Sequence, residues 1–151
     1  MEKIKIRRWF EMEDFNSFFP MLKDMLKHAY GSEEKGLRIY RERYDAVNYY
    51  RNYRARPNSF LLVAENEKGK PVGFLYARRR RNDTYLYDIY VKPEYRGKGI
   101  GRALVEKLRE LAGDPIVTDT HSGAKPFFER LGFRSVKTYE EDGVVWHTMV
   151  G

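Results

Sequence analysis

The stretch from Tyr85 to Leu111, YLYDIYVKPEYRGKGIGRALVEKLREL, decides the fold of this chain. Its first seven residues are β-branched, aromatic or apolar except for Asp88, which is typical of a strand covered on both faces. Pro93 ends this strand. The apolar residues that follow recur at helical spacing, and they are Ile100, Ala103, Leu104, Leu108 and Leu111. The stretch therefore predicts a strand, a turn and an amphipathic helix.

The turn between the predicted strand and helix is rich in glycine and in positive charge. Its glycines and basic residues are Gly97, Gly99, Gly101, Arg96, Lys98 and Arg102. Glycine lets the backbone approach a ligand closely, and the first N–H groups of a helix have no acceptor within the helix. The helix dipole adds partial positive charge at the same place. This turn is therefore expected to bind phosphate groups.

The motif around the glycines is not one of the common nucleotide-binding loops. A Walker loop needs GK[ST], and the dinucleotide fingerprint GxGxxG needs an acidic residue about 20 positions further on. Residues 96–101 instead follow the pattern [RQ]-x-x-G-x-[GA], directly after a strand that ends V-x-P. A second motif, AKPFFERLGF, occupies residues 124–133. Together the two motifs resemble the GNAT superfamily of N-acetyltransferases, most sharply over residues 61–136.

The resemblance implies an α/β fold whose sheet is mixed, mostly antiparallel and splayed after the central strand, with helices on both faces. It implies acetyl-coenzyme A as co-substrate and direct transfer of its acetyl group to a primary amine. At a bulge in the central strand, which the resemblance maps onto residues 89–91, the backbone would hold the pantetheine arm and polarise the acetyl carbonyl. The cofactor-binding residues that the resemblance assigns are Ile89, Tyr90, Val91, Arg96, Gly97, Lys98, Gly99, Ile100, Gly101, Arg102, His121 and Phe128.

The chain departs from the family at three positions where relatives carry polar chemistry. Phe128 stands where many relatives have a tyrosine that protonates the leaving thiolate. Tyr87 stands where some polyamine-type relatives have a glutamate base. His121 stands where relatives often have an asparagine that touches the pantetheine arm. In an enzyme, the base would therefore come from another residue, and water could protonate the leaving thiolate.

Three residues are candidates for these catalytic roles: His121, Asp88 and Tyr87. An imidazole suits the deprotonation of an amine, although His121 could instead cap the next helix or contact the coenzyme. Asp88 is the lone charge in its strand, so it is either part of the site or the partner of an arginine. Tyr87 could relay protons through water or donate to the thiolate, or it could pack in the core.

Two basic stretches leave a second hypothesis open. Residues 78–81 are four arginines, which could bind an acidic substrate or RNA, or form a solvated edge that resists strand pairing. Residues 40–56 interleave tyrosine with arginine, a mixture suited to base stacking. In the family this region shapes the acceptor pocket. The alternative to an active enzyme is therefore a GNAT-fold protein that binds coenzyme A and catalyses only weakly, or one that binds RNA. We expect no RNA binding at physiological salt.

Length and composition favour one domain over residues 1–151. No apolar run approaches the length of a membrane span. The chain has no cysteine and three histidines, so we expect no disulfide and no metal site. The formal charge of +7 favours anionic partners, to which coenzyme A belongs. We expect a cytoplasmic enzyme that acts on a small-molecule or peptide amine and does not bind a membrane; whether it forms a homodimer stays open.

The remaining pattern gives the order βααβββαβαββ, which matches the acetyltransferase fold. Strands are expected at residues 3–9, 59–65, 71–79, 84–91, 116–119, 134–140 and 144–150. Helices are expected at residues 13–30, 37–54 and 100–111, and from an N-cap at Ser122 to Leu131, with Gly132 as the residue after the helix. Pro20 requires the first helix to kink or to begin later.

Overall fold

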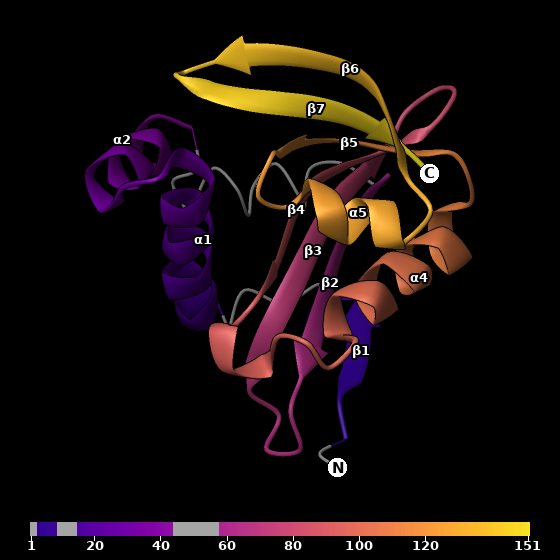
Figure 1. Ribbon diagram of the computed structural model, residues 1–151. Helices are drawn as coiled ribbons and strands as arrows, with labels where there is room; N and C mark the ends of the chain where they lie inside the picture. Colours follow the sequence, from indigo (N-terminus) through magenta and orange to yellow (C-terminus); the bar gives the residue numbers. More distant parts are fainter. Residues whose placement is uncertain (1–2, 9–14, 44–57) are drawn as a thin grey trace.

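The computed structural model describes residues 3–8, 15–43 and 58–151. Figure 1 shows the course of the chain through its helices and strands. In order they are β1 (Lys5–Arg8), α1 (Phe15–Tyr30), α2 (Glu33–Arg43), β2 (Ser59–Glu65), β3 (Pro71–Arg79), β4 (Thr84–Val91), the 3-10 turn η1 (Pro93–Tyr95), α4 (Ile100–Ala112), β5 (Ile116–His121), α5 (Lys125–Arg130), β6 (Arg134–Glu141) and β7 (Val144–Val150).

The strands of the described residues form one sheet in the order β1-β2-β3-β4-β5-β7-β6. Only β4 and β5 pair in parallel there, and the other neighbours are antiparallel. Figure 1 shows α4 and α5 on one face of the sheet and α1 and α2 on the other. The predicted mixed sheet with helices on both faces is confirmed. None of the helices in the described part of the chain has both the length and the apolarity that a membrane span requires.

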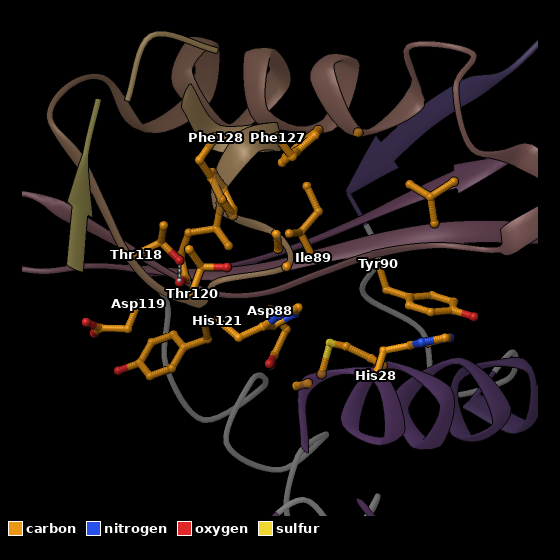
Figure 2. A pocket seen from close by; sticks show the side chains of 18 of the residues that line it. His28, Asp88, Ile89, Tyr90, Thr118, Asp119, Thr120, His121, Phe127 and Phe128 are labelled. Carbon is orange, nitrogen blue, oxygen red and sulfur yellow. Dashed lines mark hydrogen bonds between the residues drawn. The ribbon is translucent and has the colours of Figure 1, made fainter. Parts of the chain in front are cut away.

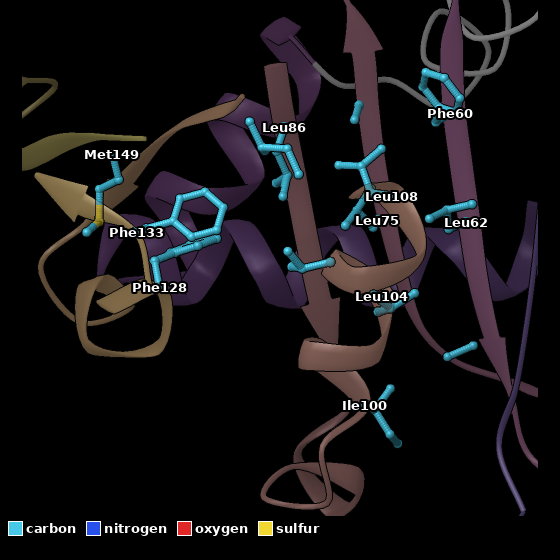
Figure 3. Close-up of a cluster of buried hydrophobic side chains, with 14 of the residues drawn as sticks. Phe60, Leu62, Leu75, Leu86, Ile100, Leu104, Leu108, Phe128, Phe133 and Met149 are labelled. Carbon is cyan, nitrogen blue, oxygen red and sulfur yellow. The ribbon is translucent and has the colours of Figure 1, made fainter. Parts of the chain in front are cut away.

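The core lies between α4 and the middle of the sheet. Ile100, Leu104 and Leu108 of α4 are buried against Leu62, Leu75 and Leu86 of three neighbouring strands (Figure 3). This contact confirms the apolar face expected from helical spacing. Leu111 was expected on the same face, but it is 37% exposed because it lies in the last turn of α4.

The sheet opens between β4 and β5. Their pairing runs only from Thr84 with Ile116 to Leu86 with Thr118. Beyond this point, the edge of β4 that faces β5 has no strand partner among the described residues. The splayed sheet that the family resemblance implies is therefore present, and it leaves the second half of β4 facing a gap.

The bulge of the central strand lies earlier than expected. Tyr76 of β3 pairs with Asp88 and Ala77 pairs with Leu86, so Tyr87 is the extra residue. Residues 89–91, onto which the family resemblance maps the bulge, pair regularly with residues 73–75 of β3. The backbone edge of residues 89–91 that faces away from β3 borders the gap, because β5 does not pair with these residues.

Several predicted boundaries shift. Helix α2 begins at Glu33 rather than 37, because Ser32 accepts a hydrogen bond from the Lys35 N–H at 3.1 Å and so caps an earlier turn. Trp9, residues 13–14 and residues 44–54 of the predicted elements lie outside the described residues. Helix α1 contains Pro20 as its sixth residue.

The region after β5 corrects the expected N-cap. Strand β5 continues to His121 and α5 begins only at Lys125, with Ala124 at the N-cap and no side chain capping it. The Ser122 hydroxyl instead hydrogen-bonds to His147 Nε2 at 2.8 Å. Neither Ser122 nor the ring of His121 caps α5. Gly132 follows the helix with φ of 89°, as predicted.

Gly101 is fixed by packing between α4 and α5. A Cβ at this position would lie 2.8 Å from Cε1 of Phe127, closer than carbon atoms can approach. We expect Gly101→Ala to lower the free energy of unfolding by about 1–3 kcal/mol, because the ring must move. In chemical denaturation, Phe127→Leu should recover part of this loss in the double variant. Additive losses would contradict the contact as the cause.

Candidate functional site

A pocket of about 830 Å³ occupies the gap between β4 and β5. Its walls come from α1, β4, the loop into α4, β5, α5 and the β6–β7 hairpin. Figure 2 shows Phe127 and Phe128 on one side of this space and His121, Asp88 and Asp119 on the other. The pocket thus joins the glycine-rich turn to the residues that the sequence proposed for catalysis.

The glycine-rich turn forms one end of the pocket. Gly97 and Gly99 have φ of 76° and 82°, a conformation that side chains disfavour. A Cβ on Gly99 would meet no protein atom within 4 Å, so the space beside it is open. The first helical bond of the turn runs from Ala103 N–H to the Gly99 carbonyl, at 3.0 Å. The N–H groups before Ala103 therefore begin the helix without helical acceptors.

The predicted cofactor residues of this turn fall into three groups. Arg96, Gly97, Gly99 and Arg102 line the pocket around the helix start. Ile100 and Gly101 also line it, but both are buried, Ile100 in the core and Gly101 against Phe127. Lys98 does not line the pocket, and its ammonium lies 5.2 Å from the centre of the Tyr95 ring. The backbone, two arginines and the helix dipole at this end suit a phosphate-bearing group.

Helix α1 reaches this end of the pocket through Asp24. The Tyr90 hydroxyl donates to the Asp24 carboxylate, and His28 lies 3.5 Å from it. Arg96 donates to the Val91 carbonyl at 2.8 Å and lies 4.0 Å from Asp24. Burial raises the pKa of the Tyr90 hydroxyl, and the hydrogen bond to Asp24 raises this pKa further. This contact could not be predicted from the sequence, because Asp24 and Tyr90 are 66 residues apart.

His121 lies at the end of β5, half-buried in the pocket wall. Its ring stands edge-on to Trp146, with centroids 6.4 Å apart. Burial lowers the pKa of His121, and the positive charge of His28 lowers it further. The imidazole is therefore neutral at neutral pH and can accept a proton. Of the three candidates, His121 best combines position with protonation state.

The other two candidates differ in their surroundings. Asp88 is 5% exposed and lines the pocket, so it is a buried carboxylate within the site. Tyr87 is 41% exposed, and its ring lies tilted to Tyr76 and edge-on to Tyr85, at centroid distances of 5.6 and 4.6 Å. The alternative that Tyr87 packs in the core is therefore wrong, because the residue is exposed and lines the pocket.

Phe128 closes the pocket from α5. It is 2% exposed and packs edge-on to Phe127 and Phe133, at 5.0 and 5.3 Å. A phenyl ring carries no dissociable proton, so this position supplies only apolar surface.

A second polar group lies along β5 from His121. The Asp119 carboxylate accepts hydrogen bonds from the Tyr85 hydroxyl and, at 2.5 Å, from Thr148 Oγ1. Burial and Asp119 raise the pKa of Tyr85, and burial with the nearby charge of Asp119 raises the pKa of Tyr139 to about 12. Both phenols therefore stay protonated and can donate. Tyr139 and Trp146 are missed by the sequence motifs, although they face each other in the predicted hairpin.

The four arginines at residues 78–81 are mostly occupied by local contacts. Arg79 donates to the carbonyls of Leu111 and Ala112 at the end of α4, at 3.3 and 3.2 Å. Arg80 forms two hydrogen bonds with Asp83, at 2.6 and 2.7 Å. Arg78 lies over the Tyr87 ring at 5.9 Å. The expectation of an edge that resists strand pairing is wrong, because β3 pairs with β2 on one side and β4 on the other. The contacts of the run lie within the fold. Most of the tyrosine-rich stretch 40–56 lies outside the described residues.

Curated relatives match the chain over part of their length. It is 38% identical over 82 residues to a thialysine N-epsilon-acetyltransferase of Sus scrofa, covering 50% of this chain and 46% of that protein. It is 32% identical over 88 residues to the peptidyl-lysine N-acetyltransferase YjaB of Escherichia coli, covering 57% of each. The matches thus span about half of these relatives.

Solved structures share the fold over nearly the whole chain. The PaiA N-acetyltransferase of Thermoplasma acidophilum, in complex with coenzyme A, gives a TM-score of 0.81 at 22% identity, covering 96% of this chain and 98% of that one. A GCN5-related N-acetyltransferase of Rhodopseudomonas palustris gives 0.77 at 23% identity, with 99% and 96% covered. The model of the acetyltransferase (GNAT) family matches residues 19–133, well over half of the sequence. The chain therefore belongs to the GNAT acetyltransferase family.

Proposed function

We propose that this protein transfers an acetyl group from acetyl-coenzyme A to a primary amine of a small molecule, a peptide or a lysine. The observation that carries the proposal is the continuous pocket from the glycine-rich start of α4, through the gap beside β4, to His121. The thialysine and peptidyl-lysine acetyltransferases named above support an amine acceptor. We place the protein in the cytoplasm, as expected from its sequence.

Different parts of the pocket would bind different parts of the coenzyme. The free N–H groups at the start of α4, with Arg96 and Arg102, would hold the pyrophosphate of the coenzyme. The backbone edge of residues 89–91 that lacks a strand partner would hold the pantetheine arm in the gap, except at the Val91 carbonyl, which already accepts from Arg96. The coenzyme supplies an acetyl thioester, whose carbonyl carbon is open to attack by an amine. Fixing both reactants in one pocket lowers the entropic part of the barrier.

His121 would act as the general base. An amine attacks only in its neutral form, and most primary amines are protonated at neutral pH. Because burial keeps His121 neutral, its free ring nitrogen can take the proton of the incoming amine. Asp88, buried in the same wall, is the second candidate for this role, and Tyr87 acting through water is the third.

The leaving thiolate needs less help than the amine. A thiolate is a much better leaving group than an amine because its conjugate acid is more acidic. We therefore expect Phe128→Tyr, which restores the hydroxyl that many relatives carry, to keep or raise the rate of thiol release. Activity below one tenth of wild type, with the coenzyme still bound, would show that Phe128 is needed as an apolar wall.

The proposal is tested with a panel of amines, peptides and proteins in the presence of acetyl-coenzyme A, reading the release of free thiol. We expect thiol release above the rate of hydrolysis with at least one class of amine. Coenzyme binding without release for any class would favour the second candidate, a coenzyme A-binding protein with weak catalysis. Phe128, buried and apolar at the position of the usual acid, is the observation that favours that candidate.

A further inference from the structure

The charges of the pocket are divided between its two ends. Its arginines, Arg96, Arg102 and Arg130, come from the loop and helices at the coenzyme end. Its carboxylates, Asp88, Asp119 and Glu141, come from β4, β5 and β6. The whole chain carries a formal charge of +7, so acidic side chains at one end are not a consequence of overall composition. The division suits two ligands of opposite charge.

Aromatic rings line the carboxylate end. They are Tyr30, Tyr85, Tyr87, Tyr139 and Trp146. Tyr30 and Trp146 meet edge-on at 5.8 Å, and Tyr85 meets Tyr87 at 4.6 Å. Aromatic faces attract cations, and the guanidinium of Arg80 already lies 4.7 Å from the Tyr85 ring. Since Arg80 is paired with Asp83, its charge does not compete for Asp119.

Asp119 has hydrogen-bonding capacity left for a ligand. It accepts from Tyr85 and Thr148 and is also hydrogen-bonded by the Tyr139 hydroxyl, which leaves about one of the roughly four acceptor sites of a carboxylate. Among the ion pairs of the described residues, none joins Asp119 to a lysine or an arginine. A carboxylate beside aromatic rings, held by hydroxyl donors rather than by a cation, is suited to receive a cation from the ligand.

The distance between Asp119 and His121 sets the length of a ligand that contacts both residues. The two residues are two apart on β5, so their side chains point to the same face. Strand geometry separates them by about 6.6 Å. An extended alkyl chain advances about 1.3 Å per bond, given bond lengths near 1.5 Å. Two nitrogen atoms joined by five bonds, with four carbons between them, would therefore reach both residues.

We propose that the acceptor carries a second positive charge, and that Asp119 with its aromatic surroundings binds this charge while His121 faces the reacting amine. This inference rests on the proposed acetyl transfer and narrows its acceptor to aliphatic diamines and longer polyamines. The bound ammonium fixes the acceptor along β5, so that the other nitrogen is held beside the thioester.

The test compares a four-carbon diamine with n-butylamine, which has the same carbon chain and one amine. We expect the wild-type enzyme to have a kcat/KM at least about tenfold higher for the diamine. Asp119→Asn should raise KM for the diamine by about tenfold while changing kcat little, and leave KM for butylamine within about twofold. Asp119→Glu, which keeps the charge, should recover part of the affinity for the diamine.

Glu140→Gln is the matched control, because it removes one negative charge from exposed β6 outside the pocket. It should leave both KM values unchanged. Equal kcat/KM for the two amines in wild type, or equal effects of Asp119→Asn on both, would overturn this inference while acetyl transfer still stands. If neither amine nor any other acceptor gives thiol release, the proposed function itself fails. A coenzyme-dependent rise in melting temperature is measured for each variant, so that misfolding is recognised.

Discussion

Replacing Gly99 by valine is expected to abolish the rise in melting temperature that saturating acetyl-coenzyme A gives the wild-type protein. Gly99 has φ of 82° at the N-cap of α4, and a side chain there would project into the open space where the pyrophosphate is expected to lie. It would also strain the backbone by about 1–2 kcal/mol. A ligand in hundredfold excess over its dissociation constant stabilises a protein by about 2.7 kcal/mol, so the loss is measurable by thermal denaturation.

Gly69→Val separates blocked binding from backbone strain. Gly69 has φ of 77°, and a Cβ there also meets no atom within 4 Å, but it lies in the turn between β2 and β3. This control should lose similar stability and keep the full coenzyme-induced rise. If Gly99→Val keeps the rise as well, the glycine-rich turn does not hold the coenzyme.

Removing the imidazole of His121 should have the largest effect on catalysis. General bases contribute about 10²–10⁴-fold to rates, so His121→Ala should lower kcat at neutral pH by a factor in that range. The deficit should shrink as pH rises, because the amine then loses its proton without help. In the wild type, the rate should fall as pH drops through the lowered pKa of His121, where the imidazole becomes charged.

Two further variants make the pH profile specific. The charge of His28 helps to lower the pKa of His121, so His28→Gln should move the acidic limb to higher pH and leave the plateau in place. Asp88→Asn examines the second candidate base and should be compared after its stability is measured. If His121→Ala and Asp88→Asn both keep wild-type rates across the pH range, neither residue is the general base. Tyr87 acting through water would then be the remaining candidate.

Most of the sheet could be predicted because its strands carry local signals. The bounds of β2 and β3 agree with the predictions, as does the β6–β7 hairpin to within one residue, since each strand is framed by Gly, Pro or Asp at its turns. The ends of some helices and strands were harder to predict from the sequence. Ser122 looked like an N-cap, but its hydroxyl is used by His147, 25 residues away, and no local pattern records that partner.

The candidate site, too, could be predicted from the sequence only in part. The glycine-rich turn could be read from the sequence because its function rests on backbone conformation at adjacent residues. The group around Asp119 could not, because Tyr85, Tyr139 and Thr148 come from three different strands. The packing role of Gly101 could not be read from the sequence either, because its missing side chain makes room for Phe127 of another helix. The bulge at Tyr87 depends on pairing with β3, which sequence periodicity does not reveal.

The most direct test of acetyl transfer compares two products of one reaction: free thiol from acetyl-coenzyme A, and acetylated amine measured by mass spectrometry. With a four-carbon diamine or another accepted amine, we expect the two to form in equal amounts, and Gly99→Val to form neither above background. Thiol release that does not depend on the amine, or that yields no acetylated product, would contradict transfer of the acetyl group to an amine in this pocket.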